Sequence, residues 1–266
     1  MAAQKEVDSV PGLGGLYAKA VAGTTVKPVL KRVPGIGGRF GGGTPRLPAT
    51  YPHMLAFPLS MQIMTDSSFP FPVIGLVHIQ NRIEQLRPIR DDEPLTIRVR
   101  VEDLEPHPKG KQFHVRAEAE VGSETVWRSD STYLRKGGGS GEKKESEESG
   151  PEPADPSALW TVPDDIGRRY AKVSGDSNPI HLRRSTAMAM GMSRPIAHGM
   201  WTKAHCLGAL EGELPDAFAI DVAFKLPIQL PAKVAFRTWE EGSTRQLSVR
   251  DHKSGKPHVT GAVERL

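Results

Sequence analysis

Residues 199–210, Gly199-Met-Trp-Thr-Lys-Ala-His-Cys-Leu-Gly-Ala-Leu210, carry the pattern that decides the fold. Met200, Ala204, Leu207 and Leu210 recur at spacings of four, three and three residues, which places them on one face of an α-helix. A helix with such a stripe needs an apolar surface to cover it, and the concave face of a curved antiparallel sheet provides one. The sequence therefore predicts an α+β fold in which a sheet wraps a central helix.

The same order of elements occurs twice along the chain. Residues 111–118, Lys-Gln-Phe-His-Val-Arg-Ala-Glu, align with residues 245–252, Arg-Gln-Leu-Ser-Val-Arg-Asp-His, and both alternate in the manner of a half-buried strand. A strand-rich block precedes each copy, at 77–101 and at 220–238, and an apolar helix candidate lies further upstream in each half. We expect two units of helix followed by sheet, with their sheets joined edge to edge.

Residues 136–156 separate the two copies. This stretch contains no large apolar residue and many charges, so it cannot bury enough surface to offset the entropy lost on ordering. We interpret it as a flexible linker between an N-terminal half, residues 1–135, and a C-terminal half, residues 157–266.

Composition narrows the classes of function. The net charge of +4 suits an anionic partner, and the lack of a basic helix or of an aromatic-and-basic binding motif favours a small anionic ligand over nucleic acid. The single cysteine, Cys206, excludes an internal disulfide and a multi-cysteine metal site, which fits a reducing cytoplasm. No apolar signal region and no stretch of about 18 apolar residues is present, so we expect neither secretion nor a membrane span.

Residues 170–181, Tyr-Ala-Lys-Val-Ser-Gly-Asp-Ser-Asn-Pro-Ile-His, place a carboxylate and an imidazole five positions apart across a turn that Pro179 stiffens. Asp176 and His181 could hold one water between them. Taken singly, Asp176 could only cap the turn, and His181 could be a buried structural histidine. Gly199, at the start of the predicted helix, would offer an unpaired backbone N–H to a developing oxyanion.

This set of groups matches the demands of one reaction. Adding water across a polarised double bond needs a base to take a proton from water, an acid to protonate the neighbouring carbon, and a donor for the charge on the carbonyl oxygen. Histidine serves as base or acid near neutral pH, and a nearby carboxylate can orient the water or exchange the proton. Asn178, extended because it precedes proline, either contacts the substrate or fixes the loop.

Residues 170–181 together with residues 196–200, Ile-Ala-His-Gly-Met, resemble the signature of the MaoC-like hydratase/dehydratase family, the R-specific enoyl-CoA hydratases. The resemblance implies a hot-dog fold and a lyase of fatty-acid metabolism. Such an enzyme hydrates trans-2-enoyl thioesters to R-3-hydroxyacyl thioesters, or runs the reverse dehydration, without a metal or redox cofactor. It makes Asp176 and His181 the catalytic pair and assigns the Gly199 N–H to the oxyanion hole. The residues expected to bind substrate are Tyr170, Ser174, Asn178, Arg183, Arg194 and His198.

The N-terminal half lacks this motif. Its helix candidate begins Tyr51-Pro-His-Met-Leu, and residues 11–44 before it are glycine-rich and basic. The chain therefore resembles the double hot-dog members of the family, in which one half keeps the catalytic residues and the other widens the acyl tunnel. His53 is then a structural histidine.

The resemblance also implies the partner, an acyl-CoA or acyl-carrier-protein thioester. Arg183, Arg184 and Arg194 flank the motif and either meet the phosphates of this partner or are solvated charges on a helix face. The double unit could act alone or pair again as a homodimer.

Two other functions stay open. Hot-dog folds also host thioesterases, and the fold alone does not choose between the chemistries. A non-catalytic acyl-binding subunit that needs a partner chain is the third reading. The spacing of Asp176 and His181 favours the hydratase.

Overall fold

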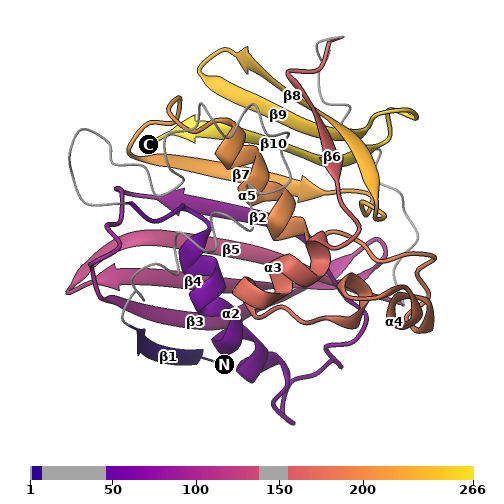
Figure 1. Ribbon diagram of the computed structural model, residues 1–266. Coiled ribbons are helices and arrows are strands. Elements are labelled where there is room, and N and C mark those ends of the chain that lie inside the picture. The colour runs from indigo at the N-terminus through magenta and orange to yellow at the C-terminus, as the bar shows by residue number, and fades with distance from the viewer. Residues whose placement is uncertain (1, 8–45, 138–154) are drawn as a thin grey trace.

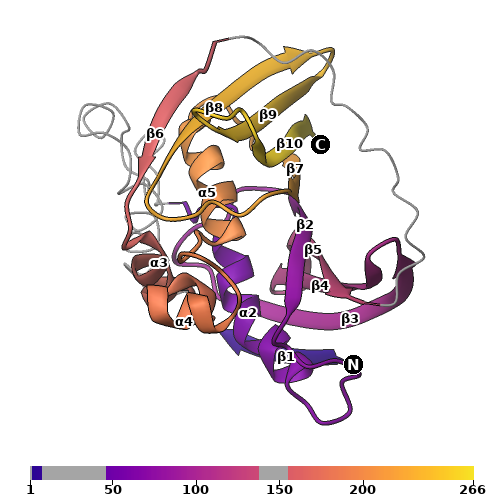
Figure 2. The same ribbon diagram turned by 90° about the vertical axis from the view of Figure 1, so that its right-hand side faces the viewer.

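The computed structural model describes residues 2–7, 46–137 and 155–266. One ten-stranded antiparallel sheet, in the order β1-β3-β4-β5-β2-β7-β10-β9-β8-β6, curves around two central helices (Figures 1 and 2). The strands are β1 (Ala2–Val7), β2 (Leu76–Gln85), β3 (Leu95–His107), β4 (Gly110–Val121), β5 (Glu124–Lys136), β6 (Ala158–Val162), β7 (Phe218–Phe224), β8 (Ala232–Glu241), β9 (Thr244–Asp251) and β10 (Pro257–Arg265).

The sheet confirms the internal repeat. Strands β2 and β7 pair antiparallel at its centre, from Gln80 opposite Ala223 to Gln85 opposite Phe218. Outward from this junction the order is β2-β5-β4-β3-β1 on one side and β7-β10-β9-β8-β6 on the other. Strands β4 and β9, which contain the two aligned segments except for His252, occupy equivalent places. The two sheets are therefore joined edge to edge, as predicted.

Helices α2 (Tyr51–Met64) and α5 (Gly199–Ala209) lie on the concave face of the sheet (Figure 2). The predicted stripe of α5 is buried, but the helix is buried far more widely, since every residue from Met200 to Leu207 is buried. The prediction of a single stripe was too narrow because the sheet wraps the helix on more than one side.

Helix α3 (Ile166–Ser174), the 3-10 turn η1 (Pro179–His181) and helix α4 (Arg184–Ala189) connect β6 to α5. They lie on the open side of the curved sheet (Figure 2). No helix among the described residues is long and apolar enough to cross a bilayer.

A buried ammonium group links α5 to the centre of the sheet. Lys203 is 0% exposed. Its Nζ donates to the backbone oxygen of Asn81 (2.8 Å), to Asn81 Oδ1 (2.6 Å) and to the backbone oxygen of Ile220 (3.1 Å). Because Asn81 lies on β2 and Ile220 on β7, this one side chain contacts both halves of the sheet.

The division at residues 136–156 falls largely on residues 138–154, which lie outside the described part of the chain, as do residues 11–44. The matching strand order on the two sides supports the proposed halves.

Candidate active site

Asp176 lies in a tight turn that follows α3. Gly175, with φ of 76°, ends the helix in the left-handed conformation that glycine adopts without strain. Ser174 Oγ donates to the backbone oxygen of Tyr170 (2.9 Å) and accepts from the Asp176 N–H (3.2 Å). Asp176 Oδ1 accepts from the N–H of Asn178 (3.2 Å). The carboxylate thus caps its turn and still keeps its second oxygen for other partners.

Asn178 fixes the loop that carries His181. Its backbone is extended, with ψ of 125°, as the following proline requires. Its side-chain oxygen accepts from the N–H of Ile180 (3.3 Å) and caps η1. Of the two roles considered for Asn178, this geometry supports positioning of the loop.

His181 has the environment of a neutral base. Its side chain is 8% exposed, and Nδ1 lies 2.8 Å from the backbone oxygen of Ile196. Because a carbonyl oxygen only accepts, Nδ1 carries the proton and the neutral ring keeps a lone pair on Nε2. Burial lowers the pKa of His181, against the opposing effects of the Asp176 charge and the bond to Ile196.

Asp176 and His181 meet at the distance that one water spans. A carboxylate oxygen of Asp176 and a ring nitrogen each from His181 and His198 all lie within 4.8 Å of one another. Two hydrogen bonds of about 2.8 Å through a single water bridge such a gap. Within the described ranges this is also the one group of side chains close enough to hold a metal ion.

His198 contacts both members of this pair. It precedes the first residue of α5, is 3% exposed, and its ring stacks on that of His181 at 3.6 Å. Its Nε2–H donates to the backbone oxygen of Asp176 (3.0 Å), and Tyr170 packs at 4.9 Å from its ring. Burial and the neighbouring His181 lower the pKa of His198 well below its ordinary value. Tyr170, Ser174 and His198, which we expected to bind substrate, therefore contact the Asp176 loop and the histidine pair.

Gly199 is the first residue of α5, which has no side-chain cap. In the part of the chain that the structure describes, no acceptor partners its N–H. A Cβ at this position would lie 2.9 Å from the ring of Phe224, so the close approach requires glycine. The free N–H and the positive end of the helix point to an anion-accepting position.

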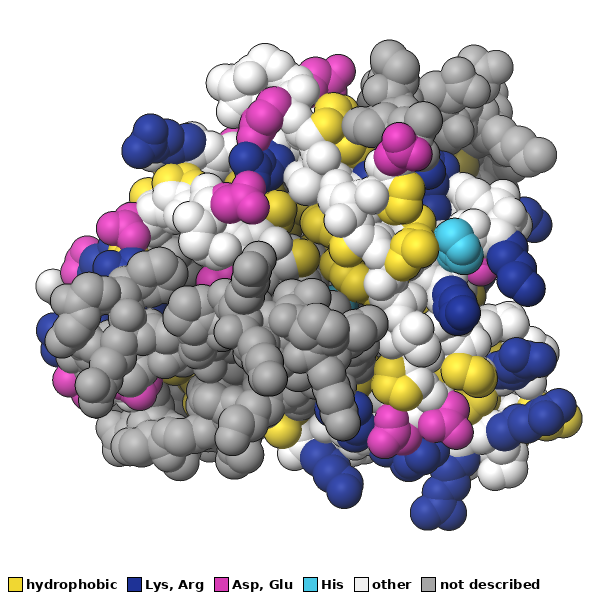
Figure 3. Space-filling model, turned by 45° about the horizontal axis from the view of Figure 1, so that its top comes forward, with side chains coloured by type: hydrophobic (Ala, Val, Ile, Leu, Met, Phe, Trp, Pro, Cys, Tyr) yellow, Lys and Arg dark blue, Asp and Glu magenta, His cyan; other side chains and the backbone are white. Residues whose placement is uncertain are grey.

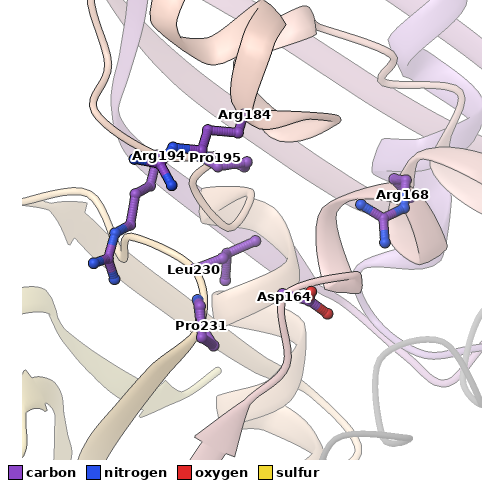
Figure 4. Close-up of a pocket in the computed structure, with 7 residues that line it drawn as sticks. All are labelled: Asp164, Arg168, Arg184, Arg194, Pro195, Leu230 and Pro231. Atoms are coloured by element: carbon purple, nitrogen blue, oxygen red, sulfur yellow. The ribbon is translucent and has the colours of Figure 1, made fainter.

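Three arginines surround a hollow of about 450 Å³ near the site (Figure 4). Arg184 and Arg194 lie on one side of Leu230 and Arg168 on the other. Pro195, which also borders the hollow, precedes the residue whose carbonyl holds His181. Lys and Arg side chains also gather at the right-hand edge of Figure 3, the side on which α4 lies in Figure 1.

The arginine set differs in part from the prediction. Arg183 precedes α4, is exposed and is not among the lining residues of the hollow. Arg168 does line the hollow, although the sequence analysis did not predict it. Its Nη1 also donates to the backbone oxygen of Leu182 (3.2 Å).

The sequence analysis did not predict two further positions that contact His181. The carbonyl of Ile196 orients His181, which no sequence pattern signals because backbone groups are common to all residues. Gly167 in α3 touches η1 so closely that a Cβ would lie 1.9 Å from the backbone oxygen of His181. A glycine inside a helix was a usable signal for this close approach.

Comparison with known proteins agrees with this geometry. A family model described as "MaoC like domain" matches residues 145–262. The 3-hydroxyacyl-thioester dehydratase X of Mycobacterium tuberculosis is 35% identical over 223 residues, which cover 83% of this chain and 80% of that protein. The (R)-specific enoyl-CoA hydratase of Aeromonas caviae is 31% identical over 91 residues, 34% of this chain and 64% of the relative.

Solved structures support the fold. The crystal structure of HtdX from Mycobacterium tuberculosis superposes with a TM-score of 0.81 at 30% identity, with 100% of both chains covered. A second protein of that organism, described as a double hot-dog fold, has a TM-score of 0.55 at 10% identity and covers 99% of this chain and 94% of its own. The predicted double hot-dog fold is confirmed. The chain therefore belongs to the MaoC-like dehydratase family, and the hydro-lyase class predicted from its motif is confirmed.

Proposed function

We propose that this protein hydrates trans-2-enoyl thioesters to R-3-hydroxyacyl thioesters, or dehydrates the latter, at Asp176, His181 and Gly199. The observation that carries the proposal is the approach of the Asp176 carboxylate to the buried imidazole of His181, within 4.8 Å, beside the start of α5. The names of the two curated relatives, a 3-hydroxyacyl-thioester dehydratase and an enoyl-CoA hydratase, support the same reaction in its two directions.

In the hydration direction, Asp176 and His181 hold the attacking water. His181 Nε2 takes a proton from this water while the water oxygen forms the bond to Cβ of the enoyl group. The double bond shifts electrons to the thioester oxygen, which gives an enolate. The imidazolium, stabilised by the charge of Asp176, then returns a proton to Cα and the carbonyl re-forms. Burial suits His181 to this role because it keeps the free imidazole neutral.

The enolate oxygen accepts the Gly199 N–H. A backbone donor in a site sheltered from water contributes about 3 kcal/mol to the stability of such an anion. The α5 dipole acts in the same sense, because the negative oxygen lies at the positive end of the helix. The ring of Phe224 packs against Gly199 at this position.

The arginine hollow is suited to the phosphate end of the thioester. Arg168, Arg184 and Arg194 would pair with phosphate groups of an acyl-CoA or of the phosphopantetheine arm of an acyl carrier protein. The stretch from Arg194 to Ile196 joins this hollow to His181. The buried, unpaired thiol of Cys206 is compatible with our proposal of a reducing cytoplasm as the working compartment.

The test is loss of the conjugated enoyl-thioester absorbance when the protein meets crotonyl-CoA. We expect Asp176→Asn and His181→Gln each to lower kcat by roughly 10²–10⁴-fold, while substrate binding is retained. Asp92→Asn, the same change at an exposed carboxylate, serves as the control.

Three results would count against the proposal. Unchanged turnover in both active-site variants would show that Asp176 and His181 are not the catalytic pair. Release of free thiol with the enoyl absorbance intact would show a thioesterase. Binding of crotonyl-CoA without either reaction would favour the non-catalytic acyl-binding subunit.

A further inference from the structure

A row of ring side chains crosses the concave face of the sheet beside the start of α5. Tyr133 on β5 lies opposite Phe113 on β4 and opposite His78 on β2, so the three side chains share one face. Their rings stack, at 4.6 Å for His78 with Tyr133 and 5.7 Å for Phe113 with Tyr133. Phe224 on β7 continues the row, 5.0 Å from His78. The row therefore runs from the N-terminal half into the C-terminal half.

The row touches the proposed active site at Gly199. The Phe224 ring is packed against Gly199, where a Cβ would meet it at 2.9 Å. At the far end of the row, burial and the charge of Asp176 raise the pKa of Tyr133. The rings of Phe224, His78 and Tyr133 thus form a wall that begins at Gly199 and runs into the N-terminal half.

The space behind this wall is occupied by more aromatic rings. Phe113 is 2% exposed and contacts Phe69 edge-to-face at 5.3 Å and Phe71 at 6.2 Å. Phe69 and Phe71 belong to the segment between α2 and β2, and they also contact each other at 6.1 Å. Well-packed rings of this kind do not shift without loss of contact energy.

The position of the wall limits the acyl chain. If the thioester oxygen lies at the Gly199 N–H, against the Phe224 ring, and Cβ lies at Asp176 and His181, the carbons beyond Cβ run along this wall toward Tyr133. A crotonyl group has a single methyl beyond Cβ, whereas an octenoyl group has five further carbons that must find room among the rings.

We propose that Tyr133, Phe113, Phe69 and Phe71, the aromatic stop, end the acyl site and make this protein selective for short enoyl thioesters. The inference rests on the proposed function and deepens it, because it assigns the acyl length. It also changes the role expected for the N-terminal half, which then closes the acyl site instead of widening it.

The experiment compares kcat/KM for crotonyl-CoA and octenoyl-CoA in the whole chain. We expect the wild-type protein to favour crotonyl-CoA by roughly tenfold or more, since even single methylenes are discriminated on this scale by a shaped pocket. Phe113→Ala and Phe71→Ala should each raise the octenoyl-to-crotonyl ratio by roughly tenfold. Phe236→Ala is the matched control, because Phe236 is also 2% exposed but stacks on Trp160 on the other side of the sheet junction.

The outcomes distinguish failure of the aromatic stop from failure of the proposed hydratase function. Equal rates for both substrates in the wild-type protein would overturn the aromatic stop and leave the hydratase standing. An equal rise of the ratio in Phe236→Ala would show general loosening and would equally reject the stop. Phe71 is only partly buried, so its variant tests the stop even if Phe113→Ala fails to fold. Failure to hydrate either substrate in the wild-type protein would overturn the proposed function itself.

Discussion

The contact between Lys203 and Asn81 yields the sharpest prediction about stability. The ammonium group of Lys203 is fully buried, and two of its three acceptors belong to Asn81. Asn81 Nδ2 in turn donates to Ser129 Oγ and to Ser131 Oγ, each at 2.9 Å. The perturbations are Asn81→Ala, Lys203→Met and the double variant.

The magnitudes follow from what each change leaves buried. Asn81→Ala removes a charge-assisted acceptor at 2.6 Å and leaves an under-coordinated ammonium in the core, at a cost of about 3–5 kcal/mol. Lys203→Met removes the charge together with its desolvation cost and takes the Nζ donor from Asn81 Oδ1 and from the backbone oxygens of Asn81 and Ile220, at a cost of about 1–2 kcal/mol. The double variant keeps neither the buried charge nor the side-chain amide of Asn81, so it should be more stable than the sum of the single changes predicts by about 2 kcal/mol.

Equilibrium unfolding in urea at pH 7 measures all four proteins. Gln80→Ala is the control, because this neighbouring residue of Asn81 is exposed and its side-chain amide donates to the carboxylate of Asp221. It should change the free energy of unfolding by no more than about 1 kcal/mol. Additive effects in the double variant, or a larger loss for Lys203→Met than for Asn81→Ala, would refute the view that the Asn81 side chain compensates a buried charge.

Three other predictions concern glycines and a histidine. Gly167→Ala places a Cβ 1.9 Å from the backbone oxygen of His181 and should lower kcat on crotonyl-CoA by roughly 10²-fold through displacement of His181; an unchanged kcat would contradict it. Gly199→Ala should lower kcat by roughly tenfold or more, since the Phe224 ring forces the helix start to move; a change in KM alone would argue against an oxyanion donor. Burial and the charge of Lys203 lower the pKa of His53 to about 4 from 6.5, so its contribution to stability is complete above pH 6.5 and is lost as pH falls toward 4, by at most about 3 kcal/mol. His53→Phe should flatten this part of the curve of unfolding free energy against pH, and a slope equal to that of the wild-type protein would show that other groups cause it.

The sequence was informative wherever the signal is local. The spacing of Met200, Ala204, Leu207 and Leu210 depends only on helix geometry, and the helix was found within one residue of its observed end. The alignment of residues 111–118 with 245–252 predicted the equivalence of β4 and β9 because repeated elements repeat their alternation of buried and exposed side chains. The turn with Gly175 and Pro179 depends on backbone preferences of those two residues, so the proximity of Asp176 and His181 was foreseeable.

Other features depended on how the halves pack. The single stripe predicted for α5 missed the burial of Lys203, because the acceptors of this ammonium lie 122 positions away on β2 and 17 away on β7. Arg168 entered the arginine hollow, and Arg183 did not, because the orientations of α3 and α4 decide which exposed side chain borders it.

The amino-acid sequence by itself determined the two helix-and-sheet units, their order and the pairing of a carboxylate with an imidazole, since each of these follows from periodicity or from one short turn. The tertiary structure alone decided that Tyr133 and His78 of the N-terminal half form one row of rings with Phe224 of the C-terminal half. Which rings become neighbours depends on the antiparallel register of β2 on β7 and of β5 on β2. Register is set by the summed packing of the whole concave face, which no short segment encodes.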